Sequence, residues 1–446
     1  MSEVLAPARR RRAEAPSGLD AGAGELLALA RDAFERRLDP GSEAPLAVGF
    51  SGGGDSLALL LATRAWARSA GRRVLALTVD HGLQPQSRAW TLSAMETARS
   101  LGVESQALAW RGDKPAAGLP ARARRARHAL LAEAARAAGA GVLLLGHTRD
   151  DLLEGALMRA EGSSLGDPRE WAPSPVWPEG REVFLLRPLL QARRAALRAI
   201  LAGTGAAWID DPANDDPASA RARARARLAP SAPPVPVRPD TAALADLAGL
   251  VRVGWSGWIA VGREALSAAG PETGRRFLAA ACVCAGGGAD PPRHGRAEAL
   301  YRRIASGERF TSGLAGARVE AGEAVQVFRE ASTPLRRRTD EVWDGRFEIA
   351  GLEPGAEIRT LRGLAARLSA AERRRLREIP ASARAGLPAI VSGDGESVTC
   401  PILAQGSEAS VRSLVGPRLG AACGVFAREH EVRPGPDGEP GKGALS

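Results

Sequence analysis

The six residues SGGGDS follow the apolar run LAVGF (46–50) and precede a run rich in leucine and alanine. Three consecutive glycines let backbone N–H groups approach an anion closely, and a helix that starts here contributes the positive end of its dipole. Two serine hydroxyls add hydrogen-bond donors. The pattern therefore predicts a loop that binds the phosphates of a nucleotide. The residues predicted to bind it are Ser51, Gly52, Gly53, Gly54, Asp55 and Ser56.

Asp55 is the unusual member of this loop, because a carboxylate repels phosphate. A magnesium ion would resolve the conflict, since Mg²⁺ binds carboxylate and phosphate oxygens and neutralises a departing pyrophosphate. The loop lacks the lysine of GxxxxGK[ST] and does not match GxGxxG. A structural turn rich in glycine is the alternative, but strand, SGGGDS and helix together are more specific than a turn requires. We expect Asp55 to be a magnesium ligand and a catalytic residue.

A second polar cluster lies in LLLGHTRDDLLEGALMR (143–159), where His147 ends an apolar run and three carboxylates follow it. Asp150 and Glu154 are four residues apart and share one helix face, with Asp151 beside them. Acids in a first helical turn also serve as caps, which is the structural alternative. Capping accounts for one or two carboxylates, but less well for three beside a histidine. We therefore predict catalytic roles for all four residues.

Two further segments carry polar residues that allow more than one interpretation. Asp80 ends the run VLALTVD (74–80) and His81 follows it. Their place at the sheet edge favours nucleotide binding, and the alternative is a structural DHG turn. The segment WIDDPANDDPASARARARARL (208–228) alternates alanine with arginine. A period of two would distribute arginines around a helix, so a solvated helix and an RNA-binding segment both remain open.

Short apolar runs alternate with longer alanine-rich stretches through the first half of the chain. The runs lie at 46–50, 74–80, 103–110, 142–147 and 183–190, and two helical stretches lie at 57–69 and 121–138. This alternation predicts an α/β fold, a Rossmann-like parallel sheet with helices on both faces. Ligands of such sheets bind at the carboxyl ends of the strands, where both polar clusters fall.

The proline-rich segment LAPSAPPVPVRPD (228–240) predicts a break in the second half of the chain. The expected organisation is a disordered tail at 1–24, a catalytic domain at 25–228, a linker at 229–240, a mainly helical domain at 241–334, a small α+β domain at 335–432 and a disordered tail at 433–446. Strands are predicted in the small domain at 346–349 and 389–391.

Composition limits the class of protein and its compartment. No apolar run reaches the roughly 18 residues that a membrane span requires, and the arginine-rich start lacks the apolar core of a secretory signal. Cys282, Cys284, Cys400 and Cys423 lack the spacing of a zinc site, so we expect buried thiols in a reducing cytoplasm. The formal charge of +10 is almost all arginine, which polyanion binding or a GC-rich genome would each explain.

The SGGGDS loop resembles the PP-loop of the N-type ATP pyrophosphatases, which cleave ATP between the α and β phosphates and adenylate an oxygen of a second substrate. The segments VDHGLQ, ARRARH, GHTRDD and WIDDPAN, in this order, resemble the tRNA(Ile)-lysidine synthase family over about residues 45–228. This sequence departs from the family pattern at His128, Leu152, Gly155, Ala213, Ser219 and Ala222.

The resemblance implies a cytoplasmic ligase that joins free lysine to carbon 2 of the wobble cytidine in the CAU anticodon of a minor isoleucine tRNA. ATP, with Mg²⁺, would adenylate the carbon 2 oxygen and release pyrophosphate, and the lysine amine would then displace AMP. The resemblance also implies that the helical domain at 241–334 binds tRNA. The residues that it assigns to substrate or RNA binding are Arg124, Arg127, Asp211, Asn214, Arg221, Arg223 and Arg225.

Three other functions are alternatives. Thiolation of tRNA generally uses cysteines near the ATP site, and residues 1–281 contain none. Amidation of a small molecule by ATP usually needs an ammonia source, and the sequence has no glutaminase-like cysteine motif. A catalytically inactive RNA-binding module is disfavoured by the intact Ser51, Asp55 and acidic cluster.

Overall fold

The computed structural model describes most of the chain. The described residues are 17–112, 114, 117–163, 166, 168–210, 219–228, 241–336, 338–339, 341–404 and 409–432. Residues 1–16, the predicted linker at 229–240, the predicted tail at 433–446, and Asp211 and Asn214 lie outside them. The chain divides into two compact units, one of Met1–Ala116, Ala137–Glu170 and Leu185–Val235, the other of Ala117–Arg136, Trp171–Phe184 and Pro236–Ser446.

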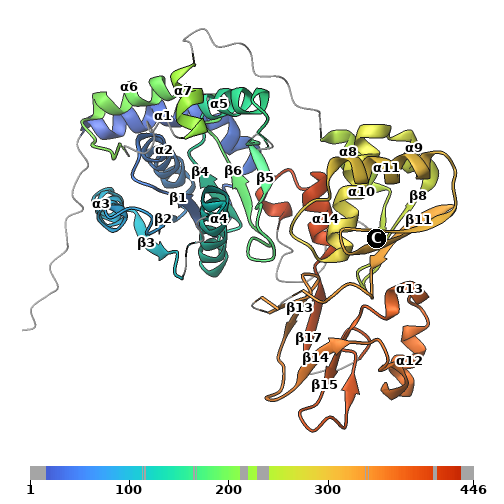
Figure 1. Cartoon of the computed structure of the whole chain (residues 1–446). Coiled ribbons are helices and arrows are strands. Elements are labelled where there is room, and N and C mark those ends of the chain that lie inside the picture. The colour runs from blue at the N-terminus through green and yellow to red at the C-terminus, as the bar shows by residue number, and fades with distance from the viewer. Residues whose placement is uncertain are drawn as a thin grey trace, which may run out of the picture. The chain divides into compact units, whose positions relative to one another are not determined.

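A six-stranded sheet underlies the N-terminal half of the chain (Figure 1). Its strands are β1 (Leu46–Gly49), β2 (Val74–Asp80), β3 (Glu104–Ala109), β4 (Val142–Leu145), β5 (Trp171–Pro173) and β6 (Phe184–Leu186). The strand order is β3-β2-β1-β4-β6-β5, and the pairs β3–β2, β2–β1 and β1–β4 are parallel. All four residues of β1 and of β4 are buried, as expected for central strands covered on both faces. The predicted α/β fold is confirmed.

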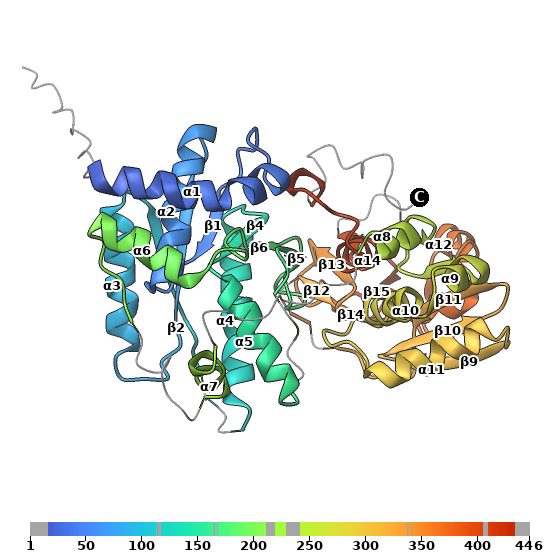
Figure 2. The same ribbon diagram turned by 90° about the horizontal axis from the view of Figure 1, so that it is seen from above.

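The helices of the first unit follow the predicted alternation with the strands. They are α1 (Ser17–Arg37), α2 (Gly54–Ala70), α3 (Ser87–Ser100), α5 (Arg149–Ala160), α6 (Arg194–Thr204) and α7 (Ala220–Ala226). Helices α1, α2 and α6 pack together, as Figure 2 shows, and α3 packs on β2 and β3. Residues 17–24 were predicted as part of a tail but belong to α1, because Ala23, Leu26 and Ala30 bury one face of this helix.

The second unit contains further helices and three small sheets. Its helices are α4 (Leu119–Ala137), α8 (Ala242–Gly249), α9 (Arg263–Ala268), α10 (Pro271–Gly286), α11 (His294–Ala305), α12 (Ala370–Leu376), α13 (Ala381–Arg384) and α14 (Val415–Cys423), with the short 3-10 turns η2 (Ala365–Arg367) and η3 (Glu429–Glu431). Its strands are β7 (Arg252–Val253), β8 (Ile259–Gly262), β9 (Phe310–Leu314), β10 (Ala317–Ala321), β11 (Ala324–Arg329), β12 (Val342–Trp343), β13 (Phe347–Ala350), β14 (Glu357–Thr360), β15 (Pro388–Val391), β16 (Val398–Thr399) and β17 (Ser410–Ser413). The sheet orders are β7-β8-β11-β10-β9, β12-β13-β17 and β14-β15-β16.

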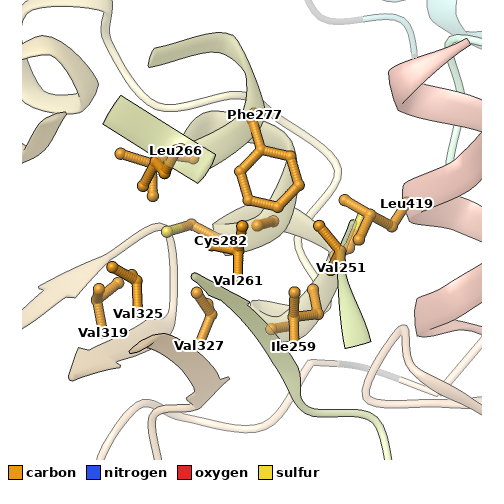
Figure 3. Packing of buried hydrophobic residues seen from close by; sticks show 14 of the residues in the cluster. Val251, Ile259, Val261, Leu266, Phe277, Cys282, Val319, Val325, Val327 and Leu419 are labelled. Carbon is orange, nitrogen blue, oxygen red and sulfur yellow. The ribbon is translucent and has the colours of Figure 1, made fainter. Parts of the chain in front are cut away.

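The prediction of a mainly helical segment at 241–334 is incomplete, because this segment also forms the five-stranded sheet. Val319, Val325 and Val327 alternate with more exposed neighbours and bury one sheet face, the period of two that indicates strands. Figure 3 shows these valines packed with Phe277 and Cys282 of α10. All four cysteines are buried, as predicted. None of the described helices is long and apolar enough to cross a membrane.

Candidate active site

The SGGGDS loop is a tight connection between β1 and α2. Gly52 has a φ of +82°, which favours glycine, and a Cβ there would lie 2.7 Å from Cδ1 of Ile209. The Ile209 N–H donates to the Gly52 carbonyl at 2.9 Å. Gly53 is the N-cap of α2, so the first amides of this helix border the loop. The predicted strand, glycine-rich turn and helix start are therefore present, and the turn is one that an anion could approach.

The two serines of the loop make different contacts. The buried Ser56 hydroxyl donates to the Gly53 carbonyl at 2.8 Å and accepts from the Ser51 N–H at 3.3 Å. These bonds fix the shape of the loop. Ser51 is exposed, with its hydroxyl 3.2 Å from that of Ser56. Ser51 is therefore free to turn toward a ligand, whereas Ser56 holds the loop closed.

Adjacent strands bring the two polar clusters together. Strand β4 pairs directly with β1, so the residues that follow each strand meet at one sheet edge. Gly146 packs so closely on the phosphate loop that a Cβ there would lie 2.9 Å from the Asp55 carbonyl oxygen. The chain then passes His147 and enters α5, which carries the three acids. The predicted neighbourhood of the two clusters is present.

Arg194 joins the two clusters through one guanidinium. Its Nε donates to Asp55 Oδ2 at 2.8 Å, and its Nη1 donates to Glu154 Oε1 at 2.9 Å. Its Nη2 lies 3.5 Å from Asp151 Oδ2. The acid of the phosphate loop and two acids of α5 therefore share a single cation.

Glu154 is the most enclosed of these acids, with 0% of its side chain exposed. Besides Arg194, its Oε1 accepts from Arg225 Nε at 2.9 Å and its Oε2 accepts from Arg221 Nε at 2.9 Å. Arg221 and Arg225 lie four residues apart on α7, which packs on α5. An ionised carboxylate can be buried this deeply because several charged donors compensate for the lost water.

Asp151 and Asp150 have capping contacts as well as ion pairs. Asp151 Oδ2 accepts from the Thr148 N–H at 2.8 Å and completes a capping box at the start of α5, while its Oδ1 accepts from Arg221 at 2.9 Å. Asp150 Oδ2 accepts from the backbone N–H of Arg194 at 2.7 Å and so caps α6. Both acids therefore help to position the helices that carry the charged cluster.

Burial and pairing shift the pKa values of these acids in different directions. Burial raises the pKa of Asp55 above its ordinary value, against the opposing charge of Arg194. Burial also tends to raise the pKa values of Asp150 and Glu154, but hydrogen bonds from their arginine partners outweigh it, so the pKa of each is lowered. Asp150 and Glu154 are consequently weak bases, whereas Asp55 is a stronger one.

His147 and Asp80 lie at the same sheet edge. His147 Nδ1 accepts from Arg187 Nε at 3.2 Å, which leaves the ring proton on Nε2. Asp80 Oδ1 accepts from the Gly82 N–H at 2.8 Å, a turn contact that also fits the structural alternative for this segment. His81 is half-buried beside it.

The structure separates the residues predicted to contact RNA. Arg221 and Arg225 belong to the charged cluster, while Arg223 of α7 is exposed. Arg124 is exposed and Arg127 is half-buried on α4, in the second unit. Burial of Ala222 and Ala224 orients α7, so the alanine–arginine repeat forms neither a uniformly solvated helix nor a uniform basic surface.

Sequence reasoning missed Arg187, Arg193 and Arg194. Arg193 forms an ion pair with Asp150 at 3.2 Å, in addition to the bond that Asp150 accepts from the Arg194 backbone. The available signal was the segment RPLLQARRAALRAI (187–200), which follows an apolar strand as the two polar clusters do. The arginines of this segment were not distinctive in the sequence, because almost every basic residue of the chain is arginine.

Asp55 offers one atom to a cation. Its Oδ1 is buried and has no hydrogen-bond partner, which suits a metal ligand. Within the part of the chain that is described, no group of three or more His, Cys, Asp or Glu side chains is arranged to hold a metal ion. A magnesium ion at Asp55 would therefore need oxygens from a nucleotide to complete its coordination.

Comparisons with known proteins identify the family of the chain. A family model for the PP-loop domain matches residues 29–232. The tRNA(Ile)-lysidine synthase of Caulobacter vibrioides is 50% identical over 414 residues, which cover 90% of this chain and 98% of the relative. The proteins of the same name from Rhizobium meliloti and Mesorhizobium japonicum are each 35% identical, over 341 and 371 residues, and cover 70% and 74% of this chain and 74% and 78% of the relatives.

Proposed function

The chain belongs to the tRNA(Ile)-lysidine synthase family, and from that premise we propose that it ligates free lysine to carbon 2 of the wobble cytidine in a minor isoleucine tRNA with a CAU anticodon. The carbon 2 oxygen attacks the α-phosphorus of ATP, and pyrophosphate leaves. The lysine ε-amine then forms the new bond to carbon 2, AMP leaves, and one proton is lost from the amine.

The observation that carries this proposal is the shared guanidinium of Arg194. This one guanidinium contacts both Asp55 of the phosphate loop and Glu154 of α5, so the two acids lie within one side chain of each other. A nucleotide on the loop and an amine at the acids of α5 would therefore be neighbours. Adenylation of the carbon 2 oxygen and attack of the amine on carbon 2 both need this proximity of nucleotide and amine.

The unpartnered Oδ1 of Asp55 supports a magnesium site in this proposal. When bound, Mg²⁺ would neutralise the charge that develops on the leaving pyrophosphate. The chain's own contribution is the phosphate loop, where Gly52, Gly53 and Gly54 admit the phosphates and the start of α2 attracts them. Ser51 would add a hydroxyl donor, and Asp80 and His81 would border the nucleotide.

The acids of α5 are suited to holding a cation more than to removing a proton. The lowered pKa values of Asp150 and Glu154 make both weak bases toward an amine with an ordinary pKa of about 10.4. We propose that Asp151 and Glu154 bind the lysine ε-ammonium by exchange with a guanidinium. His147, with its proton on Nε2, is a candidate donor to the substrate oxygen.

The cysteines argue against the thiolation alternative. Burial raises the pKa of Cys282 to about 12, that of Cys284 to about 11 and that of Cys400 to about 12. Burial also raises the pKa of Cys423 to about 12. Because the thiolate is the reactive form, these buried thiols are poor sulfur carriers.

We also propose the division of labour expected from the sequence. The first unit, which begins with α1 at Ser17, carries the catalytic residues, and residues 241–334 contribute to tRNA binding, with reaction in the cytoplasm. Arg124, Arg127 and Arg223 are candidate RNA contacts, as are Asp211 and Asn214. Discrimination against methionine tRNA with the same anticodon must then come from contacts outside the triplet, because the anticodon bases are identical.

The test supplies the full chain with ATP, labelled lysine and either of two tRNAs that carry CAU, the minor isoleucine tRNA or methionine tRNA. We expect label only in the isoleucine tRNA, with one pyrophosphate released per lysine incorporated. Label in neither tRNA would refute the function, whereas equal label in both would refute the selectivity. Omission of lysine separates adenylation from ligation, since pyrophosphate release should then stop after at most one turnover.

A further inference from the structure

Trp255 is the one exposed tryptophan among the nine of this chain, all of which lie in described segments. Its relative exposure is 46%, whereas the other eight are buried or half-buried. An exposed indole does not gain the free energy of burial, so a tryptophan on the surface can indicate a binding site. Within the second unit this ring lies at the turn between β7 and β8.

The turn that presents Trp255 is rigid. The Gly254 N–H donates to the Trp258 carbonyl at 2.8 Å, and the Gly257 N–H donates to the Gly254 carbonyl at 2.8 Å. Gly257 has a φ of +85°, and a Cβ there would lie 3.2 Å from Cγ2 of Val415. A Cβ at Gly254 would overlap the Trp258 indole. The sequence GWSGW therefore fixes the backbone on both sides of an exposed aromatic ring.

A guanidinium is held beside this ring. The Cζ atom of Arg375 lies 5.7 Å from the centroid of the Trp255 ring, and its Nη1 donates to the Leu403 carbonyl at 2.6 Å. The carbonyl contact holds the cation in place without neutralising its charge. An aromatic ring beside a fixed guanidinium is a surface on which a nucleobase can stack.

Helix α12, which carries Arg375, adds unpaired positive charge. Residues 362–384 contain seven arginines and two glutamates. One of those glutamates, Glu372, is buried in the capping box of α12 with Ser369, so it does not neutralise the surface. Arg374 and Arg377 are exposed and form no ion pair with the described residues. The charge is therefore available to phosphates.

We propose that Trp255 and Arg375 form a stacking site for an unpaired base of the RNA substrate, with Arg374 and Arg377 contacting the flanking phosphates. The proposal rests on the proposed function only in requiring that the chain binds RNA. The ring supplies sequence-tolerant stacking, and the arginines supply salt-dependent affinity. This site lies outside the phosphate loop and the acidic cluster, so it would affect RNA binding and not the chemical step.

The experiment compares Trp255→Ala, Trp255→Phe and wild type in binding to the minor isoleucine tRNA, to a single-stranded oligonucleotide and to an RNA duplex with blunt ends. Loss of one stacked base weakens binding by about 5- to 150-fold. We expect that loss for Trp255→Ala on the tRNA and the single strand, recovery in Trp255→Phe and no change on the duplex. Leu250→Ala is the matched control, because Leu250 is an exposed apolar residue at the start of the same hairpin.

Kinetics and salt dependence complete the test. Trp255→Ala should raise the KM for tRNA and leave kcat and the KM for ATP unchanged. Arg374→Ala and Arg377→Ala should each reduce the slope of log Kd against log salt by about 0.7 to 0.9. Equal binding by Trp255→Ala and wild type would overturn the stacking site, as would an equal loss on the duplex. Failure of wild type to ligate lysine while Trp255-dependent RNA binding persists would overturn the proposed function alone.

Discussion

Replacement of Arg194 by methionine tests how the site is held together. Methionine keeps an unbranched apolar stem but removes the guanidinium that touches Asp55, Glu154 and Asp151. The three acids do not lose the same share of their ion-pair partners. Glu154 retains Arg221 and Arg225, and Asp151 retains Arg221, whereas the direct ion pair of Asp55 is with Arg194.

The expected magnitude follows from that asymmetry. Removing one partner of a buried ion pair costs about 3–5 kcal/mol, and the partial exposure of Asp55 places the cost near the lower end. Protonation of Asp55 limits the cost, because neutralising an aspartate of ordinary pKa requires about 4 kcal/mol at pH 7 and about 1.5 kcal/mol at pH 5. The pKa of Asp55 is already raised in the folded chain, so the destabilisation should grow as pH rises and shrink as pH falls.

Native-state hydrogen exchange of peptides from α2 and α5 measures the opening free energy of the first unit separately from that of the second. We expect Arg194→Met to lower their opening free energy by about 3 kcal/mol at pH 7 and by less than about 1.5 kcal/mol at pH 5. In an Asp55→Asn background the same substitution should cost less than about 1 kcal/mol, because no buried charge is left unpaired. The control is Arg198→Met on the same helix, whose exposed pair with Asp210 is worth at most about 1 kcal/mol. An equal cost of Arg194→Met in both backgrounds would show that Arg194 does not act through Asp55.

Three further substitutions or conditions test the site. Asp55→Asn should keep the fold but lower pyrophosphate release at least about 100-fold, and wild-type turnover would remove the case for a magnesium ligand. Asp151→Asn and Glu154→Gln should each impair lysine incorporation more than ATP binding, measured as labelled product against nucleotide affinity; normal lysine use by both variants would leave the acids as helix caps only. The pKa values of Asp150 and Glu154 are lowered, so these ionised acids stabilise the fold fully above the ordinary carboxyl pKa range, and the stabilisation is lost as the pH falls below that range. The stability of wild type should therefore fall more steeply with acid than that of Glu154→Gln.

The phosphate loop and the acids of α5 could be predicted because their signals are local. A buried strand, a glycine-rich connection and an amphipathic helix are adjacent in the sequence, and the residue types that perform chemistry lie within the connection. The alternation of strands and helices then predicts that both clusters lie at the same edge of a parallel sheet. Neither inference requires knowledge of contacts between distant residues.

The arginine network could not be predicted in the same way. Arg194 follows Asp55 by 139 positions, and Arg221 follows Asp151 by 70, so only the folded chain shows which arginine pairs with which acid. The alternation of alanine and arginine in α7 was also ambiguous by itself. The fold decides it, because Arg221 and Arg225 are four residues apart on one side of α7 and both bond to Glu154, whereas Arg223 is exposed.

Charge compensation links these findings to the proposed reaction. The cluster contains four acids, Asp55, Asp150, Asp151 and Glu154, and four arginines that pair with them, Arg193, Arg194, Arg221 and Arg225. A lysine ammonium that binds Asp151 or Glu154 must therefore replace a guanidinium, since it competes for oxygens already in use, whereas Asp55 Oδ1 is open to a magnesium ion. Each displaced guanidinium regains a free charge in a partly buried site, where a phosphate or the lysine carboxylate is a suitable partner. In the proposed reaction, binding of lysine at the acids of α5 would thus release a guanidinium that can pair with a phosphate of ATP.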